Sequence, residues 1–156
     1  MIQRIQSLFL FFAFAASILM FFFPIAEFLS DFHYYKLYLM EFKNMAPSTE
    51  QIFSDYFTFP LIAFVLIIGL LSLITIFMYK KRRVQLKLIQ ISILLSIILI
   101  VGVFFGYPEA IKGQINTEAN FGISSYLTLV ALVFLVLANR GIKRDEKLIR
   151  SSDRLR

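Results

Sequence analysis

Long uncharged apolar segments alternate with short polar ones along this chain. Four of them come close to, or exceed, the roughly 20 helical residues that cross a hydrocarbon core of about 30 Å. None of the four contains Asp, Glu, Lys or Arg. The segments are 7–25, 57–79, 88–107 and 121–138. The pattern predicts four membrane-spanning helices in a single domain. Their predicted connections are 26–56, 80–87 and 108–120, followed by a tail over 139–156.

The first apolar segment shares one feature with a cleaved secretory signal. Arg4 precedes it, and Ala13, Ala15 and Ala16 resemble a small-residue cleavage site. The alanines lie only a few residues into the run, however, and residues 18–23 continue it to spanning length. We therefore expect an uncleaved membrane anchor.

Composition and charge agree with a membrane protein. Of the 156 residues 59% are hydrophobic, against about 45–50% in soluble domains. Thirteen of the 16 Lys and Arg residues fall on one side of a four-span arrangement, and seven of the ten Asp and Glu residues fall on the other. The positive-inside rule then places both termini and loop 80–87 in the cytoplasm. Because topology alone explains the net charge of +6, we expect no nucleic-acid partner.

The residue inventory excludes several kinds of membrane chemistry. The chain has no cysteine and one histidine, His33, so thiol redox chemistry, iron–sulfur clusters and bis-histidine haem are excluded. A metal site would need two or three convergent ligands from the loop in which Asp31 and Glu41 flank His33. A catalytic pocket would require Glu27, Asp31 and His33 to converge, and the sequence pairs no nucleophile with a base. The spans also lack the ionisable residue that pumps and proton-coupled transporters usually carry. We therefore expect no enzyme activity, catalytic residue, metal or cofactor, and we identify no small-molecule substrate.

Small side chains gather on faces of the predicted helices, where they let another helix approach closely. The glycines of the third span form a G-x-x-x-G pattern. The candidate packing residues are Gly102, Gly106, Ser92, Ser96, Ala13 and Ala16. Two interpretations stay open: the faces pack against one another inside a four-helix bundle, or they pack against a partner protein.

The largest predicted connection, 26–56, is unusually aromatic. Over 32–42 the alternate positions form two sets, both largely apolar, which favours an extended segment covered on both faces over an amphipathic helix. We expect a small β element over the outer ends of the helices, paired with 111–117.

Basic residues mark the loop 80–87 and the tail. In the tail, Gly141 is expected to end or bend the fourth helix. If the chain is helical from Ile142, the basic residues form one stripe with Asp145 on the opposite side. Two roles stay open, binding of anionic lipid headgroups and docking of a cytoplasmic partner. The candidate residues are Arg82, Arg83, Arg140, Lys143, Arg144, Lys147, Arg150 and Arg154.

Three sequence stretches carry a resemblance to a known family. The start MIQRIQSLFLFFA, the loop KKRRVQLKL and the end LANRGIKRDEKLIRSSDRLR resemble bacterial four-span inner-membrane proteins of domain of unknown function family 4293. The resemblance implies an integral inner-membrane protein of Gram-negative bacteria. It implies no activity and supplies no catalytic residue.

Together these observations predict an all-α integral membrane protein, a four-transmembrane-helix bundle with a small β element in the first extracytoplasmic loop. The favoured function is a non-enzymatic accessory or assembly subunit of a larger membrane complex, docking through the small-residue faces and the basic tail. The alternative is a small-solute or lipid-handling channel or transporter. A continuous polar path between the spans would favour transport, and a tightly packed interior would favour the subunit.

Overall fold

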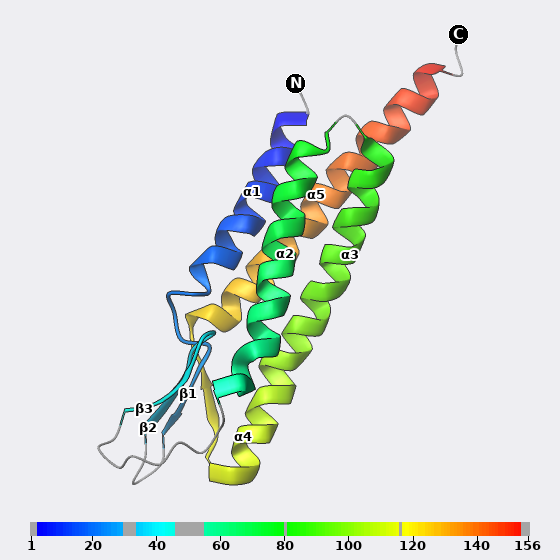
Figure 1. Ribbon diagram of the computed structural model, residues 1–156. Coiled ribbons are helices and arrows are strands. Elements are labelled where there is room, and N and C mark those ends of the chain that lie inside the picture. Colours follow the sequence, from blue (N-terminus) through cyan, green and yellow to red (C-terminus); the bar gives the residue numbers. More distant parts are fainter. Residues whose placement is uncertain (1–2, 30–33, 46–54, 80, 116, 154–156) are drawn as a thin grey trace.

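Four helices form an antiparallel bundle with a small sheet at one end (Figure 1). The computed structural model describes residues 3–29, 34–45, 55–79, 81–115 and 117–153. The bundle helices are α1 (Gln3–Leu19), α2 (Phe59–Phe77), α3 (Arg82–Val101) and α5 (Ile123–Asp153). Helices α1 and α3 each pack against both α2 and α5. The prediction of a mostly helical fold with a small β element is confirmed.

Helix α1 is shorter than the first predicted span. It ends at Leu19, and the amides of Phe21 and Phe22 bond to carbonyls three residues back, which tightens the chain into a turn. Pro24 disfavours helical conformation in the residue before it. The chain then enters strand β1 (Ala26–Leu29), so the apolar residues that follow α1 belong to the turn and the sheet.

The helix of the third predicted span contains a π-helical turn and continues beyond Tyr107. Helix α3 passes into η2 (Gly102–Gly106) and then into α4 (Tyr107–Ile115). Pro108 has no N–H, and in an α-helix its ring clashes with the carbonyl four residues back. Just before it, the Tyr107 N–H bonds to the Gly102 carbonyl five residues back. This wider turn accommodates the proline and lets the helical path continue.

The sheet has four antiparallel strands in the order β3-β2-β1-β4. The described part of the predicted extended segment, 34–42, forms strand β2 (Tyr34–Leu37), the turn 38–41 and the first residue of strand β3 (Phe42–Asn44). The predicted pairing with 111–117 is wrong, because residues 111–115 belong to α4. The strand that the second outer connection supplies is β4 (Ala119–Phe121), and it pairs with β1.

The sheet turns one face toward the bundle, and that face is buried in β1 and β2. Phe28, Leu37 and Leu39 are fully buried and join the bundle core, whereas Tyr34 and Lys36 on the other face are half-buried. The prediction that both faces are covered is therefore wrong for the second face. A short 3-10 turn, η1 (Asp55–Thr58), leads into α2, and Thr58 ties it to the sheet region by donating a 3.2 Å hydrogen bond to the Met40 carbonyl.

Helix α5 runs without interruption through Gly141, so the predicted end or bend there is wrong. Its 31 residues are about 46 Å long at about 1.5 Å per residue. This exceeds a hydrocarbon core by about 16 Å. Figure 1 shows the C-terminal part of α5 extending beyond the other three helices, at the end where both termini lie.

The outside of the bundle is rich in exposed apolar side chains, as expected of a protein that crosses a membrane. Leu70, Phe105 and Val133 are 54%, 71% and 56% exposed. Three helical stretches are long and apolar enough to span: Tyr56–Phe77, Arg82–Gln114 and Ile123–Lys147. The apolar part of α1, Ile5–Leu19, is shorter.

Candidate functional site

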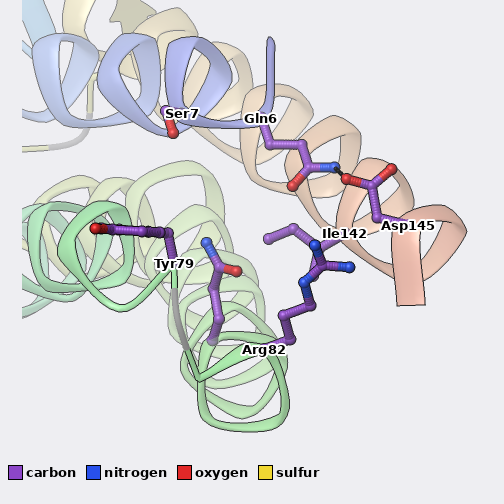
Figure 2. Close-up of a pocket in the computed structure, with 7 residues that line it drawn as sticks. Gln6, Ser7, Tyr79, Arg82, Ile142 and Asp145 are labelled. Atoms are coloured by element: carbon purple, nitrogen blue, oxygen red, sulfur yellow. Dashed lines mark hydrogen bonds between the residues drawn. The ribbon is translucent and has the colours of Figure 1, made fainter. Parts of the chain in front are cut away.

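A polar pocket lies at the end of the bundle that carries both termini (Figure 2). Its free volume of about 10 Å³ has room for about one water molecule. Its walls come from the first turns of α1 and α3, the residues after α2, and α5, which continues past it. The lining residues are Gln6, Ser7, Tyr79, Arg82, Gln85, Ile142 and Asp145.

Asp145 is the buried carboxylate of this pocket. Its side chain comes from α5, and the residue is only 8% exposed. The Gln6 amide of α1 donates a hydrogen bond of 2.5 Å to Asp145 Oδ2 (Figure 2). Asp145 Oδ1 is buried and has no hydrogen-bond partner in the part of the chain that the structure describes. This oxygen of the buried carboxylate is therefore both unbonded within the described residues and closed off from solvent.

Arg82 enters the same pocket from the first turn of α3. Figure 2 shows its side chain extending from α3 toward Ile142 and Asp145 of α5. Its Nη1 atom is buried and lacks a hydrogen-bond partner among the described residues, and no ion pair joins it to Asp145. Buried charges are costly unless they are paired and hydrogen-bonded. The pocket thus holds two opposite charges with unused hydrogen-bonding capacity.

Gly141 of α5 packs against Gln6 of α1. A Cβ atom at this position would lie 2.9 Å from Gln6 Cγ, which is closer than real contacts allow. The missing side chain gives Gln6 room to reach Asp145 one turn further along α5. Gly141 therefore serves packing and does not end the helix as predicted.

Most of the predicted basic residues lie on the outside of this end of the bundle. Arg140, Lys143, Arg144 and Lys147 of α5 are exposed, and we refer to these four as the basic surface; Arg83 of α3 is exposed as well. Arg82 differs because its side chain is half-buried and lines the pocket. For Arg150 the structure describes the backbone, which lies in α5, and not the side chain. Arg154 lies outside the described residues.

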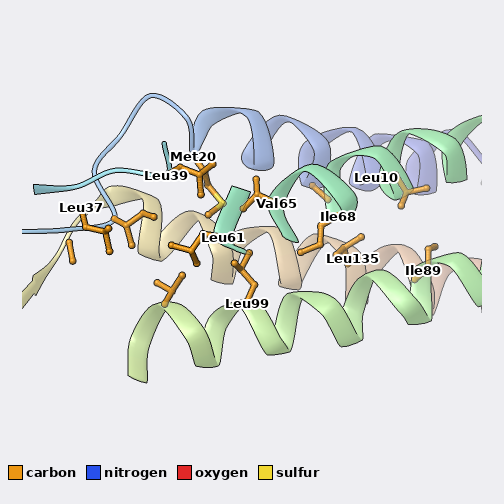
Figure 3. Close-up of a cluster of buried hydrophobic side chains, with 14 of the residues drawn as sticks. Leu10, Met20, Leu37, Leu39, Leu61, Val65, Ile68, Ile89, Leu99 and Leu135 are labelled. Atoms are coloured by element: carbon orange, nitrogen blue, oxygen red, sulfur yellow. The ribbon is translucent and has the colours of Figure 1, made fainter. Parts of the chain in front are cut away.

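Apolar side chains fill the interior of the bundle. Figure 3 shows Leu10, Ile68, Ile89 and Leu135 directed inward from the four helices, and all four are buried. The cluster continues through Met20, Val65 and Leu99 to Leu37 and Leu39 of the sheet region, forming one core along the bundle.

Between the two ends of the bundle, the buried hydroxyl groups are bonded to their own helices. Ser17, Ser72 and Ser96 each donate to the carbonyl four residues back, at 3.0, 2.8 and 2.8 Å. Thr75 does the same toward Leu71. This bonding satisfies a hydroxyl within an apolar interior without a partner from another helix.

The predicted packing residues divide into two groups. Ala13, Ala16, Ser92 and Ser96 are buried inside the bundle. Gly102 and Gly106 have open space where a Cβ atom would lie, so they make no close contact with another described helix. The interpretation that these two glycines pack against another helix of the same bundle is therefore wrong. That they contact a partner protein stays a prediction.

A closer approach, missed by the sequence analysis, occurs where α5 begins. A Cβ atom on Gly122 would lie 2.3 Å from the Pro24 carbonyl oxygen. Next to it, Ser124 donates to the Phe23 carbonyl at 2.6 Å, and Ser125 donates to the Ile25 carbonyl at 2.5 Å. These bonds join the start of α5 to the chain between α1 and β1.

One family model matches nearly the whole chain. The family is described as "Domain of unknown function (DUF4293)", and its model matches residues 2–155. The chain belongs to this family. The resemblance inferred from the sequence is thereby confirmed. No curated protein and no solved structure shows a significant match. Because the DUF4293 description names no activity, function has to be argued from the geometry.

The sheet end of this DUF4293 protein carries a small ionic network. Glu27 accepts hydrogen bonds from Lys36 at 2.8 Å and from the Tyr34 hydroxyl at 2.7 Å. The bonds from Lys36 and Tyr34 lower the pKa of Glu27, and the bond to Glu27 raises the pKa of Lys36. His33 and Asp31, the other members of the hypothetical outer pocket, lie outside the described residues. Among the residues that the structure describes, no three potential metal ligands gather.

Proposed function

We propose that this DUF4293 protein is a non-enzymatic integral protein of the bacterial inner membrane, with both termini in the cytoplasm. It serves as an accessory or assembly subunit that docks a larger membrane complex through the basic surface of α5. Anionic lipid headgroups are the second ligand of that surface.

The observation that carries the docking role is the unbroken extension of α5. The helix continues beyond the other three, with Lys143, Arg144 and Lys147 exposed on it. A continuous helix holds these charges in a fixed arrangement, which lowers the entropy lost when a partner binds. Exposed cations with fixed spacing also favour an acidic partner through electrostatic complementarity.

The bundle interior supports a subunit over the alternative of a channel or transporter. Transport requires a path lined with groups that replace water around the solute. The described interior instead presents apolar side chains, and its buried hydroxyls donate to backbone carbonyls. No observation favours the alternative specifically.

The test is co-purification from native nanodiscs, using the full-length chain that carries Lys143→Gln, Arg144→Gln and Lys147→Gln together. We expect a stoichiometric membrane partner with the wild type and its loss with this triple variant. Deleting the tail from Gly141 is a poorer test, because it also removes Asp145 and Ile142 from the pocket and the core.

A matched variant changes three exposed charges on the other side of the same end: Lys81→Gln, Arg83→Gln and Lys87→Gln. The proposal expects this variant to retain the partner. Equal retention by both triple variants, or equal loss in both, would contradict docking through α5.

A further inference from the structure

The turn between β2 and β3 leaves one apolar side chain outside the core. This turn, 38–41, lies at the bundle end opposite the two termini. Leu39 is fully buried in the core cluster, and Figure 3 shows it beside Met20. The next residue, Met40, is 63% exposed. Leu39 thus packs the turn onto the bundle, while Met40 lies on its surface.

The turn lies at the level at which α2 begins. Thr58, the residue before α2, donates its 3.2 Å hydrogen bond to the carbonyl of Met40. At the two ends of α2, Phe59 and Phe77 are 64% and 72% exposed. The 19 residues of α2 are about 28 Å long at about 1.5 Å per residue, which is close to the thickness of a hydrocarbon core of about 30 Å. Phe59 and Phe77 therefore mark the two boundaries of an apolar surface, and Met40 lies at one of them.

Two other elements reach the same level. The Tyr107 hydroxyl, just after η2, donates a 2.9 Å hydrogen bond to the Phe57 carbonyl of η1. The ring centroids of Phe104 in η2 and Phe121 in β4 are 4.8 Å apart, and α5 begins two residues after Phe121. Exposed apolar side chains lie on these elements, and we refer to the following five as the apolar belt: Met40, Tyr56, Phe59, Phe105 and Ile123.

We propose that the apolar belt lies at the boundary between acyl chains and headgroups, and that the β2–β3 turn is inserted into the bilayer through Met40. Two observations favour lipid over a partner protein. The belt continues the exposed apolar surface of α2 and α5, on which Leu70 and Val133 lie. Directly after Met40 the chain becomes polar, because Glu41 and Lys43 are exposed and form a 2.8 Å salt bridge. An apolar side chain followed by charged ones suits the change from hydrocarbon to headgroups.

The rest of the sheet extends out of the bilayer. Figure 1 shows its strands running away from the ends of the helices. From Phe42 to Met45 the chain advances by about 10 Å, at about 3.3 Å per residue. Met45 is 50% exposed and lies in water in this arrangement, so the two methionines form a matched pair. The insertion of the turn rests on the proposed membrane placement and is independent of the proposed docking role.

The test measures depth in the membrane at single cysteines. Because the chain has no cysteine, Met40→Cys, Met45→Cys and Leu70→Cys each carry a fluorescent label at one position. Each labelled full-length variant is reconstituted in phosphatidylcholine nanodiscs and quenched either by aqueous iodide or by lipid that is spin-labelled near the headgroup end of its acyl chain. Leu70 lies near the middle of α2 and is the reference for the lipid-facing surface. Thermal unfolding of each labelled variant checks its fold.

We expect iodide to quench the Met40 label at least about fivefold less than the Met45 label, because the hydrocarbon of a bilayer excludes ions. The spin-labelled lipid should quench the Met40 label strongly and the Met45 label weakly. Equal quenching of these two labels by iodide, with Leu70 protected, would overturn the insertion of the turn and leave the membrane placement intact.

Two further results would also overturn the proposal. If the Met40 label is protected from iodide and is not quenched by the lipid, protein covers the turn. If iodide quenches the Leu70 label as strongly as the Met45 label, the membrane placement is wrong and the insertion of the turn is wrong with it.

Discussion

Ser125 of α5 donates a 2.5 Å hydrogen bond to the carbonyl of Ile25, a residue 100 positions earlier in the chain. The same carbonyl accepts the Gly122 amide at 2.8 Å. Ile25 also donates its own amide to the Leu37 carbonyl at 2.7 Å. One peptide segment therefore joins the start of α5 to the sheet, and the bundle and the sheet form one unit.

Replacing Ser125 with Ala should lower the free energy of unfolding by about 1 kcal/mol, the net value of a typical buried hydrogen bond. The loss stays modest because the Gly122 amide still satisfies the Ile25 carbonyl. Denaturant titration in detergent micelles measures the change. Ser96→Ala is the control, because the Ser96 hydroxyl bonds only within its own helix and its loss should cost less than about 0.5 kcal/mol. A cost for Ser96→Ala equal to that for Ser125→Ala would contradict this account.

Gly122→Ala should be more damaging. Its Cβ atom would lie 2.3 Å from the Pro24 carbonyl oxygen, so the start of α5 must move away from the chain that leads into β1. Forced overpacking of this kind costs about 1–3 kcal/mol. The same titration tests it, with Gly113→Ala as the control because that site has open space for a Cβ atom. If both alanines were tolerated equally, the close approach at Gly122 would not be a constraint.

Gly102→Leu combined with Gly106→Leu should leave the stability of the isolated protein within about 0.5 kcal/mol of the wild type, because both sites are open. The same double variant should reduce association with any partner whose helix packs on this face. Detergent unfolding and co-purification measure the two effects separately. A large drop in unfolding temperature would show that the two glycines face a helix of their own bundle.

The Glu27–Lys36 pair should make the sheet end sensitive to acid. The pKa of Glu27 lies below its ordinary value of 4.5 in the folded state, so its contribution is complete above about pH 4.5 and is lost as the pH falls through the lowered pKa. The pKa of Lys36 is raised above 10.5, so the pair is lost on the alkaline side only beyond that value. Thermal unfolding of wild type and Glu27→Gln across this range should show a difference at neutral pH that disappears in acid. A difference that persists undiminished at pH 3 would exclude this pair as its source.

The sequence predicted the helices and part of the sheet for clear physical reasons. Uncharged apolar runs of spanning length identified the bundle helices, and the alternation over 32–42 identified β2. Strand β1 was missed because its four residues directly follow the first apolar run and are too few to show alternation. Strand β4 was missed because three residues are too few to show alternation.

The pocket was beyond prediction for a different reason. Gln6 and Asp145 are separated by 139 positions, and only the packing of α1 against α5 brings them together. A partial signal was present, since Asp145 lies opposite the basic stripe and one turn after Ile142, which is buried. That placement indicated an inward-facing carboxylate, whereas the role of Arg82 required its position at the start of α3.

The continuity of α5 has a mechanical consequence. Ser125, which joins the sheet, and Asp145, which lines the pocket, belong to one rod and are separated by about 30 Å along its axis. Because the helix passes through Gly141 unbroken, a force applied to it at Lys147 is transmitted along its axis to Ile25 and the strand that follows. The two ends of the molecule are thus mechanically coupled through one helix.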